Sequence, residues 1–250
     1  MSLLRILSVL SVLSLVSACS VPGPGQAVDG IHDPYEDRNR AVHRFNTGLD
    51  RALFSSRRDA DKPPSQVAQD FGAVAVNLSD TLSLPQTVVN QVLQGRLGRA
   101  SRNTLRFSVN ATLGFAGMFD VAGEVFRLPQ DESDFGETLA VWGAPEGAYL
   151  VLPVIGPSTQ RDAAGRVVDL FTDPLSYVLT PEQGLAATGI KVAGKAAERA
   201  RFGDTVDSVL HDSADSYAQL RLIYLQNRRF DLGEAAPAAE EIDPLAIDTE

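Results

Sequence analysis

Residues 134–165 read DFGETLAVWGAPEGAYLVLPVIGPSTQRDAAG, and this stretch determines how the whole chain is interpreted. It contains an apolar run, Tyr149 to Ile155, in which proline interrupts the aliphatic residues. The run is far shorter than the roughly 20 apolar residues that a membrane-spanning helix needs. It therefore fits either a buried strand or a surface that touches lipid. On its N-terminal side we expect a short helix from Asp134 to Trp142, which Gly143 ends. Asp134 and Glu137, three residues apart, fit a helix cap better than a catalytic acid pair.

The segments on either side of this stretch carry a helical pattern. Apolar residues recur at spacings of three, four and seven, and sustained strand-like alternation is nearly absent. Helix start signals precede several segments, for example at Pro85 and at Thr180-Pro181, where Gln183 completes a capping box. We therefore expect a mainly α-helical body over residues 31–230.

One segment does not fit a plain helix. Residues 112–126, TLGFAGMFDVAGEVF, carry three glycines among apolar residues, and glycine in a helix interior costs about 1 kcal/mol relative to alanine. Close packing of helices, which is frequent in membranes, would offset that cost. A turn between two helices would explain the glycines equally well, so both interpretations stay open.

A basic amphipathic helix is expected within residues 33–54, DPYEDRNRAVHRFNTGLDRALF. Asp33 can cap it, with Glu36 at the capping-box position. Arginines lie on one face and apolar residues on the other. The large apolar members are Val42, Phe45, Leu49 and Leu53. Such a helix can lie in the headgroup layer of a membrane, or it can pack on the protein's own core.

The N-terminal end has the pattern of a bacterial lipoprotein signal. Residues 1–18 carry one positive side chain, an apolar run and small residues at the cleavage site. Residues 16–19, VSAC, resemble a lipobox, in which Cys19 would receive the lipid. Cys19 is the only cysteine, which favours this interpretation over a chance thiol. In families with such a lipobox, a serine at the position of Ser20 usually directs the protein to the outer membrane. Residues 19–30 then form a flexible tether.

The C-terminal end is acidic, although the body is nearly balanced in charge. Residues 231–250 hold seven acids and no base, and they fit a disordered tail. The net charge of the whole chain is −10. Nucleic-acid binders usually present a strongly basic face, so this composition argues against a nucleic-acid partner.

The motifs of common lipid-cleaving enzymes are absent from the sequence. There is no G-x-S-x-G nucleophile elbow and no H-E-x-x-H zinc helix. The histidines, His32, His43 and His211, match no common metal spacing. His43 fits a half-buried amphipathic side chain better than a catalytic base. We therefore expect no catalytic residue, no metal and no cofactor.

The residues quoted so far resemble the MlaA/VacJ lipoproteins of the outer membrane. The resemblance covers nearly the whole mature chain, from DPYEDRNR and FN near its start, through RFSVNATLGFAGMFDVA at residues 106–122, to DPL at residues 173–175. The string at residues 134–165 is the most specific part, because a run of D-F-G, W-G, G-x-Y-L-x-L-P and G-P-S-T-x-R-D is not a composition effect.

This resemblance implies a ring-shaped helical bundle in the periplasmic leaflet of the outer membrane, with an amphipathic central channel and an apolar loop beside it. Members of the family remove phospholipids misplaced in the outer leaflet and pass them to a soluble periplasmic carrier of the Mla pathway. They also associate with trimeric porins. The resemblance thus implies retrograde phospholipid transport that maintains outer-membrane lipid asymmetry, without catalysis.

On that basis the apolar run and its surroundings become a candidate lipid-contacting loop. Its expected lipid contacts are Phe135, Trp142, Tyr149, Leu150, Leu152, Val154 and Ile155. Its expected hinges, which would let the loop gate the channel, are Gly143, Gly147, Pro153 and Gly156. The side chains of Arg161 and Asp162 are expected to cap or pair within the next helix.

Two alternatives stay open. The first is a structural adaptor that stabilises porins without moving lipid, for which we would expect a protein-facing patch with aromatic anchors and a polar rim. The second is a lipid-cleaving or acyl-transferring enzyme with His43 or His211 as its base.

Overall fold

The computed structural model describes residues 30–58 and 65–233 of the 250-residue chain. The expected signal peptide, the lipidation site Cys19, nearly all of the tether and residues 234–250 of the expected tail lie outside these ranges. Within them the chain is mainly α-helical, as the sequence predicts. A single two-stranded sheet interrupts the helices of the described part.

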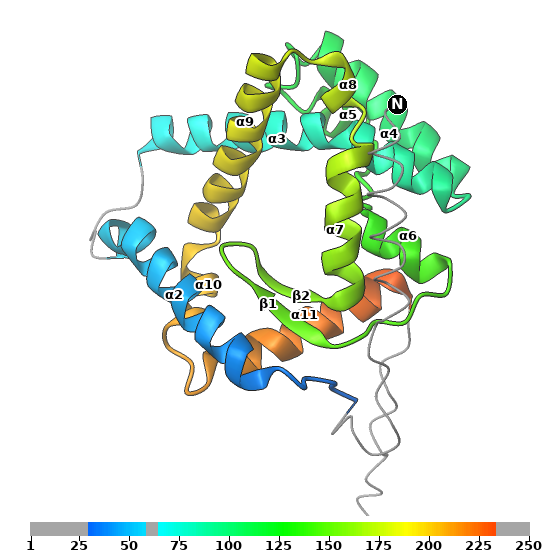
Figure 1. Ribbon diagram of the computed structural model, residues 1–250. Helices are drawn as coiled ribbons and strands as arrows, with labels where there is room; N and C mark the ends of the chain where they lie inside the picture. The colour runs from blue at the N-terminus through cyan, green and yellow to red at the C-terminus, as the bar shows by residue number, and fades with distance from the viewer. Residues whose placement is uncertain (1–29, 59–64, 234–250) are drawn as a thin grey trace, which may run out of the picture.

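The described elements surround an open centre (Figure 1). The helices and strands of this ring, in chain order, are α2 (Glu36–Arg58), α3 (Gln66–Leu93), α4 (Leu97–Thr112), α5 (Val121–Glu124), α6 (Phe135–Val141), β1 (Tyr149–Leu152), β2 (Gly156–Thr159), α7 (Gln160–Thr172), α8 (Leu175–Val178), α9 (Pro181–Arg201), α10 (Gly203–Leu210) and α11 (Ser216–Leu232). Helix α3 packs extensively on α9 and α4, and α6 packs on α7. Helices α2 and α11 complete the ring on the opposite side of the centre from α3.

Several local signals act as the sequence predicts. Asp134 caps α6 by accepting a hydrogen bond from the Glu137 N–H at 2.8 Å. Thr180 and Gln183 form the expected capping box at the start of α9. The prediction for Pro85 was wrong, because this residue lies inside the long helix α3 and does not begin a new one.

The apolar run forms a β-hairpin, so the strand that was one of the two interpretations is present and the candidate loop corresponds to the hairpin and its turn. Strand β1 pairs with β2 in antiparallel register, with Tyr149 opposite Thr159 and Leu152 opposite Gly156. Side chains along β1 alternate between buried and half-buried positions, which is the pattern of a strand with one face on the core. The strand interpretation is thus confirmed for β1, and contact of the exposed residues with lipid stays a prediction.

The glycine-rich segment 112–126 is a tight turn followed by the short helix α5. Three consecutive residues, Phe115, Ala116 and Gly117, have positive φ. A β-carbon at Gly117 would lie 2.7 Å from the Thr81 Cβ on α3, so the turn approaches α3 too closely for any larger residue. The turn interpretation is thus confirmed for this segment.

The start of α2 differs from the prediction. The helix begins at Glu36, and the carboxylate of Asp33 does not cap it. It accepts hydrogen bonds instead from Arg221 at 2.6 Å and from the hydroxyl of Tyr217. Asp33 was expected to cap α2 through a local hydrogen bond. It instead joins the start of α2 to α11, because its partner Arg221 lies 188 positions later in the chain.

Among residues 30–58 and 65–233, the apolar core is divided into two small clusters. One joins Phe135 and Leu139 of α6 to Val168 of α7. The other places Tyr149 and Val151 of β1 against α11; its α11 members are Tyr217 and Leu225. Much of the remaining buried side-chain population is polar, including Asn90, Gln91, Asn103 and Arg106. A ring-shaped chain has a smaller buried volume than a compact domain of equal length. Hydrogen bonds between buried polar side chains therefore provide part of the stability that apolar packing would otherwise provide.

Three arginines of α11 pair with carboxylates on four other segments. Arg221 binds Asp33 before α2, and Arg229 binds Glu146 before the hairpin at 2.8 Å. Arg228 contacts Asp134 at the start of α6 at 2.7 Å and Asp162 of α7 at 2.8 Å. Burial raises the pKa of Asp162, but the hydrogen bonds and charge of Arg228 outweigh this effect and lower it. Asp162 therefore stays ionised at neutral pH.

We predict that Arg228→Met destabilises the protein by about 3–5 kcal/mol, because the variant leaves the buried Asp162 carboxylate without its main counter-charge. Urea unfolding followed by circular dichroism measures the loss. The matched control is Arg38→Met, since Arg38 is exposed on α2 and its loss should change stability by less than about 0.5 kcal/mol. Equal stability of the two variants would contradict the prediction.

Candidate functional site

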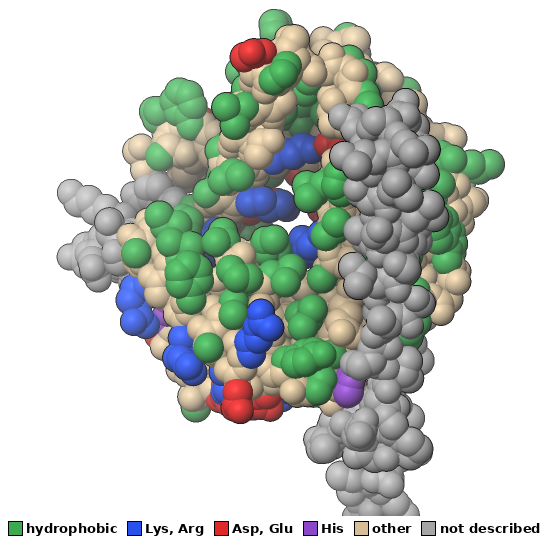
Figure 2. Space-filling view, in the orientation of Figure 1, with side chains coloured by type: hydrophobic (Ala, Val, Ile, Leu, Met, Phe, Trp, Pro, Cys, Tyr) green, Lys and Arg blue, Asp and Glu red, His purple; other side chains and the backbone are tan. Residues whose placement is uncertain are grey.

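The β1–β2 hairpin lies on the inner side of the ring. Strand β1 contacts α2, and β2 contacts both α7 and α11. The space-filling view shows an opening through the ring, with Lys and Arg side chains and a few acidic ones visible inside it and apolar side chains around its edge (Figure 2). We take this opening and the hairpin beside it as the candidate functional site.

The expected lipid contacts divide into two groups. Val154 and Ile155 form the exposed turn of the hairpin, with Val154 72% exposed, and Trp142 is also exposed. Leu150 and Leu152 are half-buried. For these five residues, contact with lipid stays a prediction.

For Phe135 and Tyr149 the structure corrects the expectation of direct lipid contact. Phe135 is 5% exposed and Tyr149 is 1% exposed. Phe135 packs between α6 and α7, with its ring edge-on to Trp142. Tyr149 packs against the rings of Tyr217 and Tyr224 on α11. Both residues are structural: Tyr149 packs the hairpin against α11, and Phe135 packs α6 against α7.

The expected hinge glycines occupy backbone conformations that suit glycine. Gly143, Gly147 and Gly156 have φ of 87°, 74° and 96°, which only residues without a β-carbon adopt freely. Val154 also has positive φ, at 69°, which is unusual for a β-branched residue. Pro153 precedes it in the turn. The turn geometry thus accounts for these residue types, while the gating role stays a prediction.

The apolar face of α2 is only partly free. Phe45 and Leu53 are exposed, and Leu49 is half-buried. Val42 packs against the cluster around Tyr149, so the helix rests on the protein core at this end. Its other apolar residues stay available for a membrane interface.

The described part of the chain exposes many more large apolar side chains than the sequence pattern indicated. They occur on most elements of the ring; prominent examples are Phe71, Phe115, Leu170, Val178, Leu185 and Phe230. Extensive exposed apolar surface in a folded protein marks contact with a membrane or a partner. No helix among the described residues is both long enough and apolar enough to span a bilayer.

Arg161 and Asp162 are buried, but they do not cap α7, and the main partners of Asp162 lie on α11 and not within the helix as expected. The backbone N–H of Asp162 donates to the hydroxyl of Thr159 at the start of α7. Its carboxylate accepts from Arg228 and from the hydroxyl of Tyr224, the latter at 2.6 Å. Asp162 therefore acts as a structural anchor for α7 and lies away from solvent.

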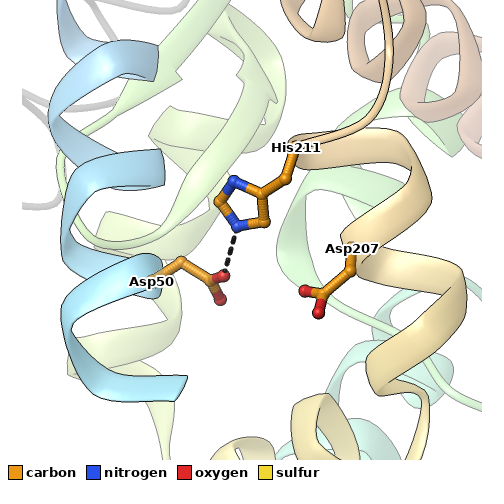
Figure 3. Close-up of side chains that lie close together, drawn as sticks. All are labelled: Asp50, Asp207 and His211. Atoms are coloured by element: carbon orange, nitrogen blue, oxygen red, sulfur yellow. Dashed lines mark hydrogen bonds and ion pairs between the residues drawn. The ribbon is translucent and has the colours of Figure 1, made fainter. Parts of the chain in front are cut away.

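Asp50, Asp207 and His211 lie close together between α2 and α10 (Figure 3). Their potential ligand atoms lie within 4.8 Å of one another, which is the spacing of a metal site. The guanidinium of Arg199 already occupies this place, however. It binds both oxygens of Asp50 at 2.7 and 2.8 Å and Asp207 at 2.5 Å. The cluster is thus an ion-pair junction that joins α2, α9 and α10.

The other histidine of interest also serves as a junction. His43 on α2 is buried, and its Nε2 lies 2.8 Å from the hydroxyl of Ser216 on α11. Burial lowers the pKa of His43, so its imidazole is neutral at physiological pH. His211 likewise contacts the carboxylate of Asp50 at 3.0 Å, so both imidazoles join elements of the ring.

A cluster of charges lies between α3 and α9. Lys195 pairs with Glu198 at 2.9 Å, and Asp80 lies near both of them. Burial, reinforced by the charge of Glu198, raises the pKa of Asp80 to about 6. Ionised and protonated forms of Asp80 therefore coexist near neutral pH, although Lys195 favours the ionised form.

The protein is a helical ring with a charged opening, an apolar hairpin turn beside the opening and many exposed apolar side chains. This combination defines the class of proteins that bind amphipathic molecules. The comparisons agree with this class. Residues 31–231 match the family model described as MlaA lipoprotein. The chain belongs to the MlaA lipoprotein family.

Named relatives share most of the length of the chain. It is 32% identical over 219 residues to the "Intermembrane phospholipid transport system lipoprotein MlaA" of Escherichia coli K12, a match that covers 85% of this chain and 82% of that protein. The protein of the same name from Haemophilus influenzae is 26% identical over 239 residues, covering 94% and 92%. An uncharacterised protein of Rickettsia conorii is 34% identical over 193 residues, covering 76% and 74%.

A solved structure shows the same fold. It comes from work on the "Structural basis for maintenance of bacterial outer membrane lipid asymmetry" and superposes with a TM-score of 0.64 at 31% sequence identity. The superposition covers 80% of this chain and 98% of the solved chain. The match thus extends over nearly the whole of the solved protein.

We predict that Asp80→Asn stabilises the protein at about pH 7.5 by about 1 kcal/mol and has little effect at about pH 4. Because the pKa of Asp80 is raised on folding, its ionisation disfavours the folded state, and this penalty grows as the pH rises from about 4 through about 6. Asparagine removes the penalty. Urea unfolding of both proteins at the two pH values tests the prediction, and a pH-independent difference would contradict it.

Proposed function

We propose that this protein is an outer-membrane lipoprotein that removes mislocalised phospholipids from the outer leaflet and passes them through its opening to a soluble carrier in the periplasm. Retrograde transfer of this kind maintains the lipid asymmetry of the outer membrane. The names of the relatives from Escherichia coli and Haemophilus influenzae support the phospholipid cargo. The proposal includes a trimeric porin and an Mla-pathway carrier as partners.

One observation carries the proposal furthest: the opening combines charged and apolar side chains. A phospholipid has a charged headgroup and apolar acyl chains, so a conduit must accommodate both at once. The charged side chains inside the opening suit the headgroup, and the apolar turn of the hairpin suits an acyl chain. Burying one large aliphatic side chain contributes about 1.5 to 3 kcal/mol, so a few contacts are enough to guide a chain.

The exposed apolar side chains support a seat in the periplasmic leaflet. Phe45 and Leu53 of α2 and Phe115 of the turn before α5 are among the candidates to enter the acyl region. A lipid on Cys19, joined through the tether, would hold the ring at the membrane after removal of residues 1–18. Residues 31–230 form the transport domain in this proposal, and the acidic tail lies outside it.

The experiment that tests the proposal uses the purified, lipidated full chain in asymmetric vesicles with labelled phospholipid in the outer leaflet. Transfer of the label to the periplasmic carrier, with the mass of the lipid unchanged, is the expected result. A change in the mass of the lipid would indicate an enzyme. If the lipid stays in place while porin still binds, the protein is a structural adaptor and the proposal fails.

We predict that Ile155→Asp lowers the rate of transfer at least about tenfold, because a carboxylate at the hairpin turn raises the cost of passing an acyl chain by several kcal/mol. Ile155 is exposed, so the fold should tolerate the change. Ile155→Leu is the matched control and should retain transfer. Full activity of Ile155→Asp would place the hairpin turn outside the lipid path.

A further inference from the structure

Two asparagines of α2 contact backbone groups of the β1–β2 hairpin. Asn39 and Asn46 are seven residues apart, so they lie on the same face of the helix, about 10 Å apart along its axis. Asn39 contacts the peptide groups on either side of Leu150, within β1, and Asn46 contacts those on either side of Pro153, in the turn that follows β1. One face of α2 therefore reaches two successive parts of the hairpin.

Asn39 binds β1 as a residue of a neighbouring strand would. Its Nδ2 donates to the carbonyl of Tyr149 at 3.0 Å, and its Oδ1 accepts from the N–H of Val151 at 2.9 Å. The same Nδ2 donates to Asp33 at 2.9 Å, which fixes the orientation of the amide. Asn39 is 3% exposed. Water therefore does not replace it at this edge.

Asn46 repeats the contact at the turn. Its Nδ2 donates to the carbonyl of Leu152 at 2.9 Å, and its Oδ1 accepts from the N–H of Val154 at 2.7 Å. Val154 is the β-branched residue with positive φ, a conformation that persists only where the surroundings hold it. The amide of Asn46 fixes the peptide groups on both sides of Pro153 and so stabilises this turn.

We propose that Asn39 and Asn46 are positioning residues that clamp the hairpin to α2 and hold its apolar turn at the opening, and this role rests on the proposed lipid-transport function. An amide is suited to the task because it offers a donor and an acceptor on one short side chain. Aspartate lacks the donor at neutral pH, and leucine lacks both groups. With the clamp in place, α2 and the hairpin move as one body.

The first test measures backbone hydrogen exchange of the full-length protein, which requires no lipid. Asn46→Leu removes both hydrogen bonds at the turn while preserving side-chain size. We expect exchange in residues 152–155 to accelerate by about tenfold, while α9 and α11 keep their protection. Asn46→Asp retains only the hydrogen-bond acceptor, so its exchange rate should lie between those of the wild-type protein and Asn46→Leu. The matched control is Asn227→Leu, at an exposed position of α11.

Asn46 is the better position for substitution because its side chain is only half-buried, so the fold should tolerate the change. Asn39→Leu affects a fully buried site, and loss of its fold would not bear on the result for Asn46. Unchanged exchange at residues 152–155 in Asn46→Leu would overturn the proposal. Acceleration of the whole protein would overturn it as well, because that outcome indicates a general loss of stability.

The second test measures the rate at which Asn46→Leu transfers labelled phospholipid from vesicles to the carrier. We expect a reduction of at least about threefold under conditions where the variant remains fully folded, since the apolar turn no longer keeps a fixed place. Faster hairpin exchange with wild-type transfer would overturn the role in transport. If the wild-type protein itself transfers no lipid, the proposed function fails, and the exchange experiment still decides whether the clamp exists.

Discussion

The ring depends on the ion pairs of α11 with carboxylates from other segments. Asp33, Asp134, Glu146 and Asp162 come from four parts of the chain, and each binds an arginine of this one helix. Gly136 and Gly165 allow the close approach of α6 and α7 that brings Asp134 and Asp162 to Arg228, because a β-carbon at Gly165 would collide with the backbone of Gly136. A buried ion pair gains stability only if its remaining donors and acceptors are also satisfied. Tyr217 and Tyr224 contribute to this by donating to Asp33 and Asp162.

This reliance on polar contacts follows from the shape. A wall around an opening has two surfaces, so few positions lie deep enough for a continuous apolar core, and the described part contains only two small clusters of this kind. Hydrogen bonds and ion pairs are directional, and they fix the angle between neighbouring elements more strictly than apolar packing does. The junction of Asp50, Arg199 and Asp207 illustrates the point, because it sets the position of α2 relative to α9 and α10.

The sequence predicts the helical class, several caps and the family, and it fails where distant segments meet. Capping at Asp134 and Thr180 depends on residues three positions away, so spacing alone reveals it. The role of Asp33 depends on Arg221, which no local pattern links to it. The division of the apolar run into buried Tyr149 and exposed Val154 depends on which face of the hairpin meets α11. The asparagines of α2 were visible within the family motif, but their partners on β1 were not.

The hairpin turn has exposed apolar side chains and a restricted backbone conformation. Its side chains are apolar and exposed, which favours mobility or aggregation in water, yet its backbone is held in a conformation that β-branched residues avoid. The hydrogen bonds of Asn46 contact only backbone atoms, so they stabilise the backbone of the turn and leave the side chains of Val154 and Ile155 exposed. In the proposed transport function, a fixed apolar turn next to charged side chains would present a phospholipid with both environments at a constant separation. If the turn were mobile, an acyl chain would have to order it on every passage, and the ordering entropy would oppose transfer.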